Sequence, residues 1–165
     1  MIFRDLFSTE EWKTLQFAHF WVFDAVASVD KKIDTEEKIA LDDIMKSGDK
    51  LMNPLMREIM LGLEYNIDRI NADFKTDTRN FREGLSEVKE LLEKKGIDKD
   101  IALGFKKTLL AIGIYIGQAS GKWFSAKFSK DEIEVVKNIG MILGVTEEQI
   151  QSPPLLNEII ETFSS

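Results

Sequence analysis

The sequence predicts an all-α protein: a single-domain bundle, residues 1–165, of about seven helices with an internal duplication around two buried central helices. Apolar residues recur with helical spacing along most of the chain, and strand-like alternation is nearly absent. Short polar segments that carry helix-capping residues separate these apolar stretches. The chain has 165 residues, of which 44% are hydrophobic, and this is enough for one domain with a sizeable core. The chain is too short for two such domains.

The first helix is expected to follow Ser8 and Glu11, which have the spacing of a capping box. Its apolar residues cover almost the whole circumference, so the helix is predicted to be buried on all sides. Asp34 and Glu37 form a second capping box before a shorter helix, which Gly48 ends.

The third helix is expected to start at Asn53 and Pro54, because Pro favours the first helical position. One of its faces is apolar, and a break is expected near Tyr65. A fourth helix ends at Gly96 and is lined by Phe81, Leu85, Val88 and Leu92.

The fifth helix, residues 100–120, is apolar nearly all round, like the first. Two such helices bury their surfaces fully only if they pack against each other. We therefore expect residues 13–28 to cross residues 101–118 at the core.

Three shorter elements are predicted to follow the fifth helix. Ser129 and Glu132 open a sixth helix, which Gly144 stops. A single turn follows Thr146, and Pro154 starts a last helix.

An internal repeat links the two apolar helices. Each leads into a polar loop and then a capping box, "ASVDKKIDTEEK" after the first and "QASGKWFSAKFSKDEI" after the second. The second loop is five residues longer and lacks the equivalents of Asp30 and Asp34. The repeat predicts an internal duplication, with acidic chemistry concentrated in one half.

The composition argues against several classes of function. A net charge of -7 and the lack of a basic stripe make nucleic acid an unexpected partner. With no cysteine and one histidine, the usual parts of zinc catalysis and cysteine nucleophiles are missing, and we expect a protein that is not an enzyme. No signal peptide pattern and no uncharged apolar stretch of about 18 residues occurs, so we expect a cytoplasmic protein without a membrane span.

The stretch "SVDKKIDTEEK" combines more oxygen ligands than any other segment. Asp30, Asp34 and Glu37 lie within one loop and one helical turn, which suits a hard divalent cation. The spacing is not that of an EF-hand. The same charges also have ordinary roles, since Asp34 caps a helix and Glu36 and Glu37 favour its N-terminus. Both interpretations, a cation site and a simple helix start, remain open.

Polar residues inside the first helix and aromatic residues in the second loop are further candidates. His19 is expected to be a core histidine with satisfied polar atoms, because no second imidazole accompanies it. Asp24 is expected to bond a neighbouring group or to border the acidic loop. The second loop contains three aromatic residues that either form an exposed partner-binding patch or close the core: Trp123, Phe124 and Phe128.

The segments "FDAVASVDKKIDTEEKIALDDIM" and "AIGIYIGQASGKWFSAKFSKDEIEVVKNIGMILGV" resemble the two halves of the tellurite-resistance TerB-like family. The resemblance covers most of the chain. It implies a single helical domain with internal duplication, a role in bacterial stress and envelope-associated systems, and divalent-cation binding through acidic residues. Asp30 falls on the family's turn aspartate and Glu37 on the acidic start of the next helix. Lys31 replaces the usual glycine, and Ser120 replaces the aspartate of the second half.

Two functions from different classes are therefore expected. The first is a divalent-cation-binding stress-response protein that holds one Ca²⁺, Mg²⁺, Mn²⁺ or Zn²⁺ ion with four carboxylates: Asp30, Asp34, Glu37 and Glu132. The alternative is an ion-free interaction module that docks a protein partner through its second loop.

Overall fold

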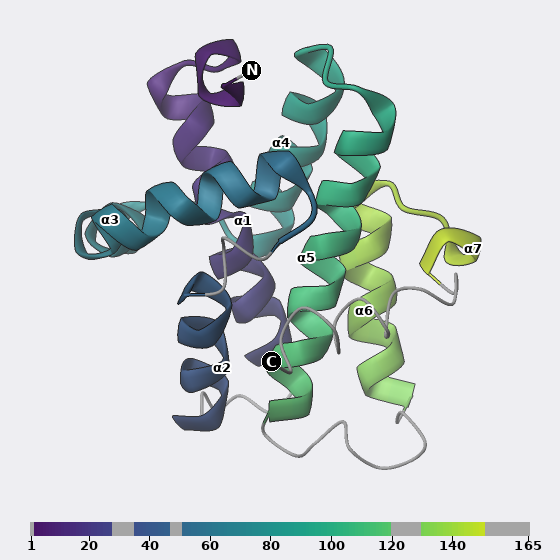
Figure 1. The fold of residues 1–165 in the computed structure, drawn as a ribbon. Coiled ribbons are helices and arrows are strands. Elements are labelled where there is room, and N and C mark those ends of the chain that lie inside the picture. Colours follow the sequence, from purple (N-terminus) through teal and green to yellow (C-terminus); the bar gives the residue numbers. More distant parts are fainter. Residues whose placement is uncertain (1, 28–34, 47–50, 120–129, 151–165) are drawn as a thin grey trace.

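The computed structural model describes residues 2–27, 35–46, 51–119 and 130–150, and every regular element in these ranges is helical (Figure 1). The elements are η1 (Phe3–Leu6), α1 (Thr9–Ala27), α2 (Thr35–Lys46), α3 (Pro54–Thr76), α4 (Phe81–Lys94), α5 (Lys99–Ala119), α6 (Lys130–Leu143) and α7 (Glu147–Ile150). The all-α prediction is confirmed.

Six of these helices, α1 to α6, match long helices predicted from the sequence. The single turn predicted after Thr146 is α7, where Thr146 and Gln149 exchange hydrogen bonds between side chain and backbone. The helix predicted from Pro154 lies outside the described residues. The predicted total of about seven helices is therefore not confirmed.

Local capping fixes several helix ends. At the start of α1, the Glu11 carboxylate accepts a 2.8 Å hydrogen bond from the Ser8 N–H, and Ser8 Oγ accepts a 3.1 Å bond from the Glu11 N–H. The predicted stops after α4 and α6 are also present. Gly96 and Gly144 have φ of 66° and 77°, the left-handed conformation that glycine adopts at least cost.

The α3 helix begins as predicted and is kinked. The Asn53 side chain accepts a 3.0 Å hydrogen bond from the Met56 N–H, with Pro54 in the first helical position. Non-helical backbone angles occur at Asn66, where φ is -131° and ψ is 23°. The break expected near Tyr65 is therefore found one residue later.

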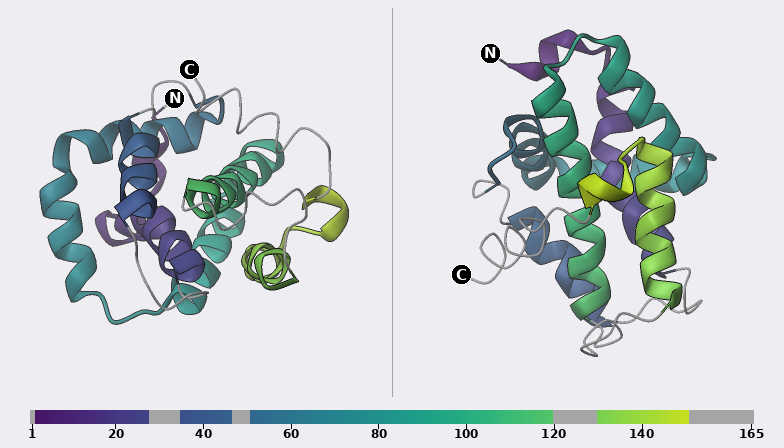
Figure 2. Two further views of the ribbon diagram at one scale, coloured as in Figure 1. Left: turned by 90° about the horizontal axis from the view of Figure 1, so that it is seen from below. Right: turned by 90° about the vertical axis from the view of Figure 1, so that its right-hand side faces the viewer.

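Helices α1 and α5 form the centre of the bundle (Figures 1 and 2). α1 packs against α3, α4, α5 and α6, and α5 packs against α2, α3 and α6. At the contact of the two central helices, a Cβ atom on Gly113 would lie 3.2 Å from Val22 Cγ1. The predicted packing of the two apolar helices is confirmed.

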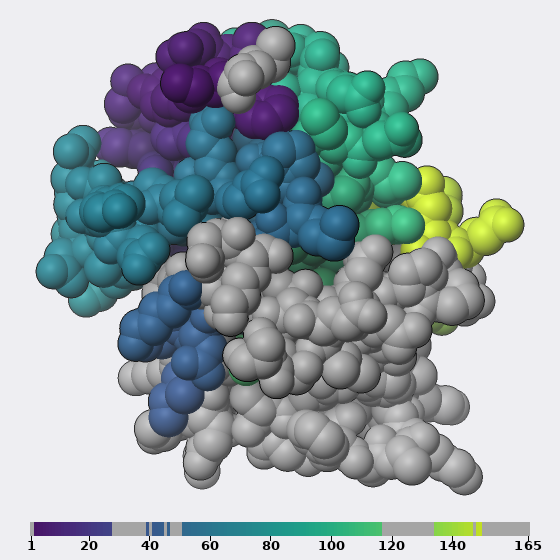
Figure 3. All heavy atoms as spheres, viewed as in Figure 1, coloured from purple at the N-terminus to yellow at the C-terminus, as the bar shows by residue number. Residues whose placement is uncertain are grey.

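The two central helices also set the direction of the chain. α1 and α5 both end, and α2 and α6 both begin, at the lower end of the molecule in Figure 1, and the second view of Figure 2 agrees. α3 runs across the other helices, and the N-terminal segment lies directly on it (Figure 3).

Candidate functional site

Most of the predicted site residues lie outside the described part of the chain. This group comprises the predicted ligands Asp30 and Asp34 and the predicted partner-binding residues Trp123, Phe124 and Phe128. Glu37 and Glu132 lie in the first turns of α2 and α6, but their side chains are outside the description. The helix ends that border both loops lie at the same end of the bundle (Figure 1).

Asp24 lies one turn before the end of α1, toward the acidic loop. Its side chain is exposed, yet the protein atoms around it remove part of its hydration and raise the pKa of its carboxyl group. No hydrogen bond or ion pair to the Asp24 side chain is found among the described residues. The expected bond to a neighbouring group is thus not seen there.

His19 is a core histidine, as predicted, with 1% of its surface exposed. Its ring lies 4.0 Å from the Phe20 ring, centre to centre. Within the described residues neither ring nitrogen has a hydrogen bond of ordinary geometry, so the expectation of satisfied polar atoms is not confirmed. Burial lowers the pKa of His19 to about 3, and the backbone of Gln16 opposes this shift only in part. The imidazole is neutral at ordinary pH.

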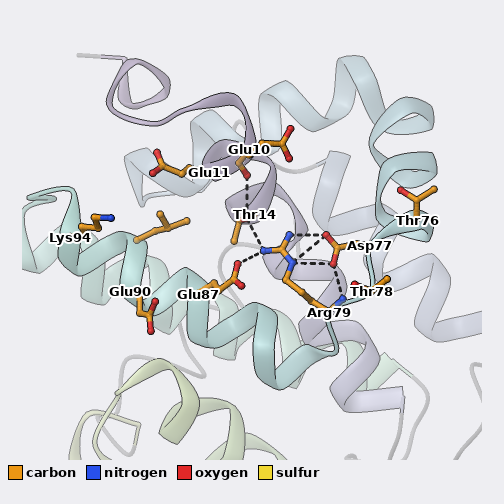
Figure 4. Close-up of a pocket in the computed structure, with 11 residues that line it drawn as sticks. Glu10, Glu11, Thr14, Thr76, Asp77, Thr78, Arg79, Glu87, Glu90 and Lys94 are labelled. Atoms are coloured by element: carbon orange, nitrogen blue, oxygen red, sulfur yellow. Dashed lines mark hydrogen bonds and ion pairs between the residues drawn. The ribbon is translucent and has the colours of Figure 1, made fainter.

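A polar pocket of about 720 Å³ opens between the start of α1, the connection between α3 and α4, and the outer face of α4 (Figure 4). We call it the Arg79 pocket. It is lined by Glu10, Glu11, Thr14, Thr76, Asp77, Thr78, Arg79, Glu87, Glu90, Leu91 and Lys94.

Arg79 is the centre of this pocket and joins three segments of the chain. Its guanidinium group donates to both oxygens of Asp77, with Nε 3.0 Å from Oδ1 and Nη2 2.7 Å from Oδ2. Nη1 donates to Thr14 Oγ1 of α1 at 3.0 Å and also to the Glu87 carboxylate of α4. The same guanidinium lies 4.9 Å from the centre of the Trp21 ring, a cation–π distance.

The charges of Arg79 and Asp77 stabilise each other. Their hydrogen bonds lower the pKa of Asp77 and raise the pKa of Arg79, so both stay charged over the ordinary pH range. Arg79 is 22% and Asp77 16% exposed at the side chain, which shields the pair from solvent. The pocket thus ties α1 to the α3–α4 connection.

The Arg79 pocket has an excess of carboxylates but no catalytic arrangement. Thr14 Oγ1 donates to the Glu10 carbonyl at 3.2 Å and accepts from Arg79, so no base is placed to activate it. Within the part of the chain that the structure describes, no group of three or more His, Cys, Asp or Glu side chains could hold a metal ion. The bonds found in this pocket are those of Arg79, which join α1, α4 and the α3–α4 connection.

Sequence reasoning missed the Arg79 pocket. One local signal was available, since Asn80 and Glu83 have capping-box residue types and form both bonds of the box at the start of α4. That signal fixes where α4 begins. The 65-residue separation between Arg79 and Thr14 leaves no comparable trace in the sequence.

The remaining findings concern the membrane and relatives. Among the described residues, none of the helices is both long enough and apolar enough to span a membrane. In comparisons with protein-family models, curated proteins and solved structures, nothing matches this chain.

Proposed function

We propose that this protein binds one divalent cation, as a cytoplasmic, tellurite-resistance-like stress-response protein of the TerB-like type. The proposed ligands are Asp30, Asp34, Glu37 and Glu132, and the proposed function is binding, not catalysis. The observation that carries the proposal is the convergence of four helix ends, because α1 and α5 end where α2 and α6 begin (Figure 1). All four carboxylates belong to segments that leave or enter this end of the bundle.

Electrostatics at this end favours a cation. The last carbonyl groups of α1 and α5 are not bonded within their helices and give their C-terminal ends a partial negative charge. The exposed Asp24 carboxylate adds to this potential from the last turns of α1. Acidic groups crowded into residues 30–37 repel one another, and a bound cation relieves that repulsion.

The proposal includes the internal duplication. In each half, a buried helix is followed by a loop and a second helix, in the order α1–α2 and α5–α6. α2 packs on α5, and α6 packs on both α1 and α5, so each second helix lies against the central helix of the other half. This arrangement supports two copies that exchange contacts at the core.

Thermal unfolding with and without metal tests the proposal. Ca²⁺, Mg²⁺, Mn²⁺ and Zn²⁺ are added separately at millimolar levels to protein freed of metal with a chelator. At 100 times its dissociation constant, a cation adds about 2.7 kcal/mol of stability, which raises the melting temperature by roughly 5–10 °C. The Asp30→Asn variant keeps the side-chain shape and should lose this rise.

Asp68→Asn is the matched control. Asp68 is exposed on α3, and its side chain makes no ion pair or hydrogen bond within the described residues. The Asp68→Asn variant should therefore respond to metal like wild type. An unchanged wild-type melting temperature with all four metals contradicts the proposal. An equal rise in wild type and Asp30→Asn contradicts it as well, and residues 28–38 are then a helix start only.

The second candidate is an ion-free interaction module that docks a protein partner through Trp123, Phe124 and Phe128. It is favoured by the position of these aromatic residues between α5 and α6, in a segment of only ten residues. Iodide quenching of tryptophan fluorescence tests it, because Trp12 and Trp21 are both buried. A strongly quenched component that Trp123→Phe removes supports a docking patch, whereas fluorescence fully protected from iodide contradicts it.

A further inference from the structure

We infer that a second pocket, between the kinked part of α3 and the first two turns of α1, binds a small anion through its phosphate or carboxylate group. This pocket has a volume of about 260 Å³, and we call it the Arg69 pocket. It lies among the described residues at the start of α1 and does not depend on the proposed cation site.

The charge of the Arg69 pocket is opposite to that of the whole chain. Three cationic side chains line it, those of Arg4, Lys13 and Arg69, and Asp73 is the one carboxylate among the lining residues. The protein as a whole has a net charge of -7. A local excess of positive charge in an acidic protein attracts anions to this pocket rather than to the rest of the surface.

Two of the cations are held in place by other bonds. Arg4 donates to the Phe7 carbonyl at 2.7 Å, and its guanidinium lies 5.8 Å from the centre of the Trp12 ring. Lys13 Nζ lies 3.5 Å from an oxygen of Asp73 and 3.7 Å from an oxygen of Glu10. These bonds fix the positions of the two charges before a ligand arrives, which lowers the entropy cost of binding.

Two further donors are free to bind a ligand. Among the described residues, the Arg69 guanidinium and the Gln16 side-chain amide make no hydrogen bond or ion pair, and both line the pocket. A guanidinium group matches the two oxygens of a carboxylate or phosphate group with two parallel N–H bonds. An anion in the pocket would complete the bonding of Arg69.

The kink in α3 helps to form the pocket. Gly62, Asn66 and Arg69 all line it, and the non-helical backbone lies at Asn66. The Asn66 amide group donates to the Gly62 carbonyl at 3.3 Å, so the side chain satisfies a backbone group next to the kink. The kink therefore belongs to the wall of the pocket and is held by its own hydrogen bond.

The opposite wall is anchored by Glu58 of α3. Its two carboxylate oxygens accept hydrogen bonds from the backbone N–H groups of Phe3, at 2.9 Å, and Arg4, at 2.7 Å. These bonds hold the N-terminal segment on α3 (Figure 3) and with it the Arg4 side chain. The pocket volume of about 260 Å³ is just below the range of about 300–1,000 Å³ for small-molecule sites, so the pocket suits one small anion.

A titration followed by NMR tests this inference. Inorganic phosphate and succinate are titrated separately into the full chain at constant ionic strength set with sodium chloride. The signal followed is the indole N–H of Trp12, which lines the pocket. We expect a saturable shift with at least one of the two anions, and the anion that saturates identifies the group preferred. Sodium chloride alone, added to the same ionic strength, should not shift the Trp12 indole N–H signal.

The main variant and its control are chosen from one helix, α3. Arg69→Gln should weaken binding about tenfold, since one charge-assisted hydrogen-bonded pair is lost. Arg57→Gln is the matched control, because Arg57 is exposed on α3, lies outside the pocket, and has a side chain without partners in the described structure. Gln16→Ala, on α1, should also weaken binding. The inference is overturned if neither anion saturates, if Arg69→Gln binds like wild type, or if Arg57→Gln weakens binding equally.

Discussion

Gly84 of α4 lies directly against the Trp21 indole of α1: a Cβ atom at Gly84 would be 2.5 Å from Trp21 Cζ2. Trp21 is completely buried, and its ring also meets Phe17 edge-on, with the ring centres 5.8 Å apart. The Arg79 guanidinium lies over the same ring. The close approach of α1 and α4 thus depends on the absence of a side chain at one position.

Gly84→Ala should destabilise the protein. The added methyl group overlaps a ring that has no free space to move into, and such overpacking costs about 1–3 kcal/mol or more. Alanine recovers up to about 1 kcal/mol through its better helix propensity, so a net loss of about 1–2 kcal/mol is expected. Urea denaturation measures the change in the free energy of unfolding.

Gly62→Ala is the control for this substitution. A Cβ atom at Gly62 has no neighbour within 4 Å, so only the helix propensity changes. This variant should be as stable as wild type or slightly more stable. If Gly84→Ala proves equally stable, the described contact between α1 and α4 is wrong.

Arg79→Ala should destabilise the protein by about 2–3 kcal/mol. The substitution leaves the Asp77 carboxylate largely shielded from solvent without its partner, and it breaks the link to Thr14 of α1. Arg79→Lys should recover little, because an ammonium group cannot form the paired bonds to Asp77. Chemical denaturation at pH 7 measures both variants.

An exposed ion pair provides the comparison for Arg79. Lys46 and Asp42 lie 2.8 Å apart on α2, with 68% and 55% of their side chains exposed. Lys46→Ala should therefore change stability far less than Arg79→Ala does, because solvent screens an exposed pair. In the double variant Asp77→Ala/Arg79→Ala, the loss should be smaller than the sum of the two single losses. Strictly additive losses would show that the pair is not coupled.

The sequence allowed the helices of this fold to be predicted because their signals are local. The all-round apolar character of residues 13–28 and 101–118 predicts two buried helices, and these are the central α1 and α5. The capping box at Ser8 and the stop at Gly96 depend on residues within a few positions of each other. The break near Tyr65 was also visible, although the backbone departs from helix at Asn66.

Features that depend on distant contacts could not be predicted in this way. The bond from Arg79 to Thr14 and the contact of Gly84 with Trp21 exist only once α1 and α4 have packed. His19 was expected to have satisfied nitrogens, but the helices packed around α1 offer it no partner in the described structure. Of the proposed cation ligands, Asp30 and Asp34 lie outside the described residues, and the side chains of Glu37 and Glu132 do as well, so the cation site stays a prediction.

His19 should make the stability of the protein depend on pH. Its pKa is about 3 in the folded chain and 6.5 in its ordinary state, so the unfolded chain takes up the proton first. A lowered histidine pKa means that stability falls as the pH drops below about 6.5 and continues to fall toward pH 3. At pH 5 this group alone should remove roughly 2 kcal/mol of the stability present at pH 7.5.

His19→Leu isolates this contribution. Leucine has a similar size and carries no proton, so the variant should lose less stability than wild type between pH 7.5 and pH 5. Carboxylates contribute equally to both proteins and cancel in the comparison. Urea denaturation at the two pH values provides the four free energies needed. Identical pH dependence in the two proteins would mean that His19 is accessible to solvent or bonded.

Asp34 precedes α2 and can act as a helix cap, as a cation ligand, or as both. As a cap, its replacement by Ala should cost about 0.5–2 kcal/mol, because a backbone N–H of the first turn loses its acceptor. Serine is an equally good cap, so Asp34→Ser should be nearly silent. The free energy of unfolding is measured for both variants, first with a chelator and then with a saturating divalent cation.

The comparison of the two variants separates the roles, because serine keeps the capping oxygen and removes the charge. Capping alone predicts the same small effect of Asp34→Ser with chelator and with metal. Ligation predicts that Asp34→Ser is silent with chelator but loses as much of the metal-induced stability as Asp34→Ala. If both variants keep the full metal-induced stability, Asp34 is not a ligand, and any cation is held by the other carboxylates at the end where α1 and α5 terminate.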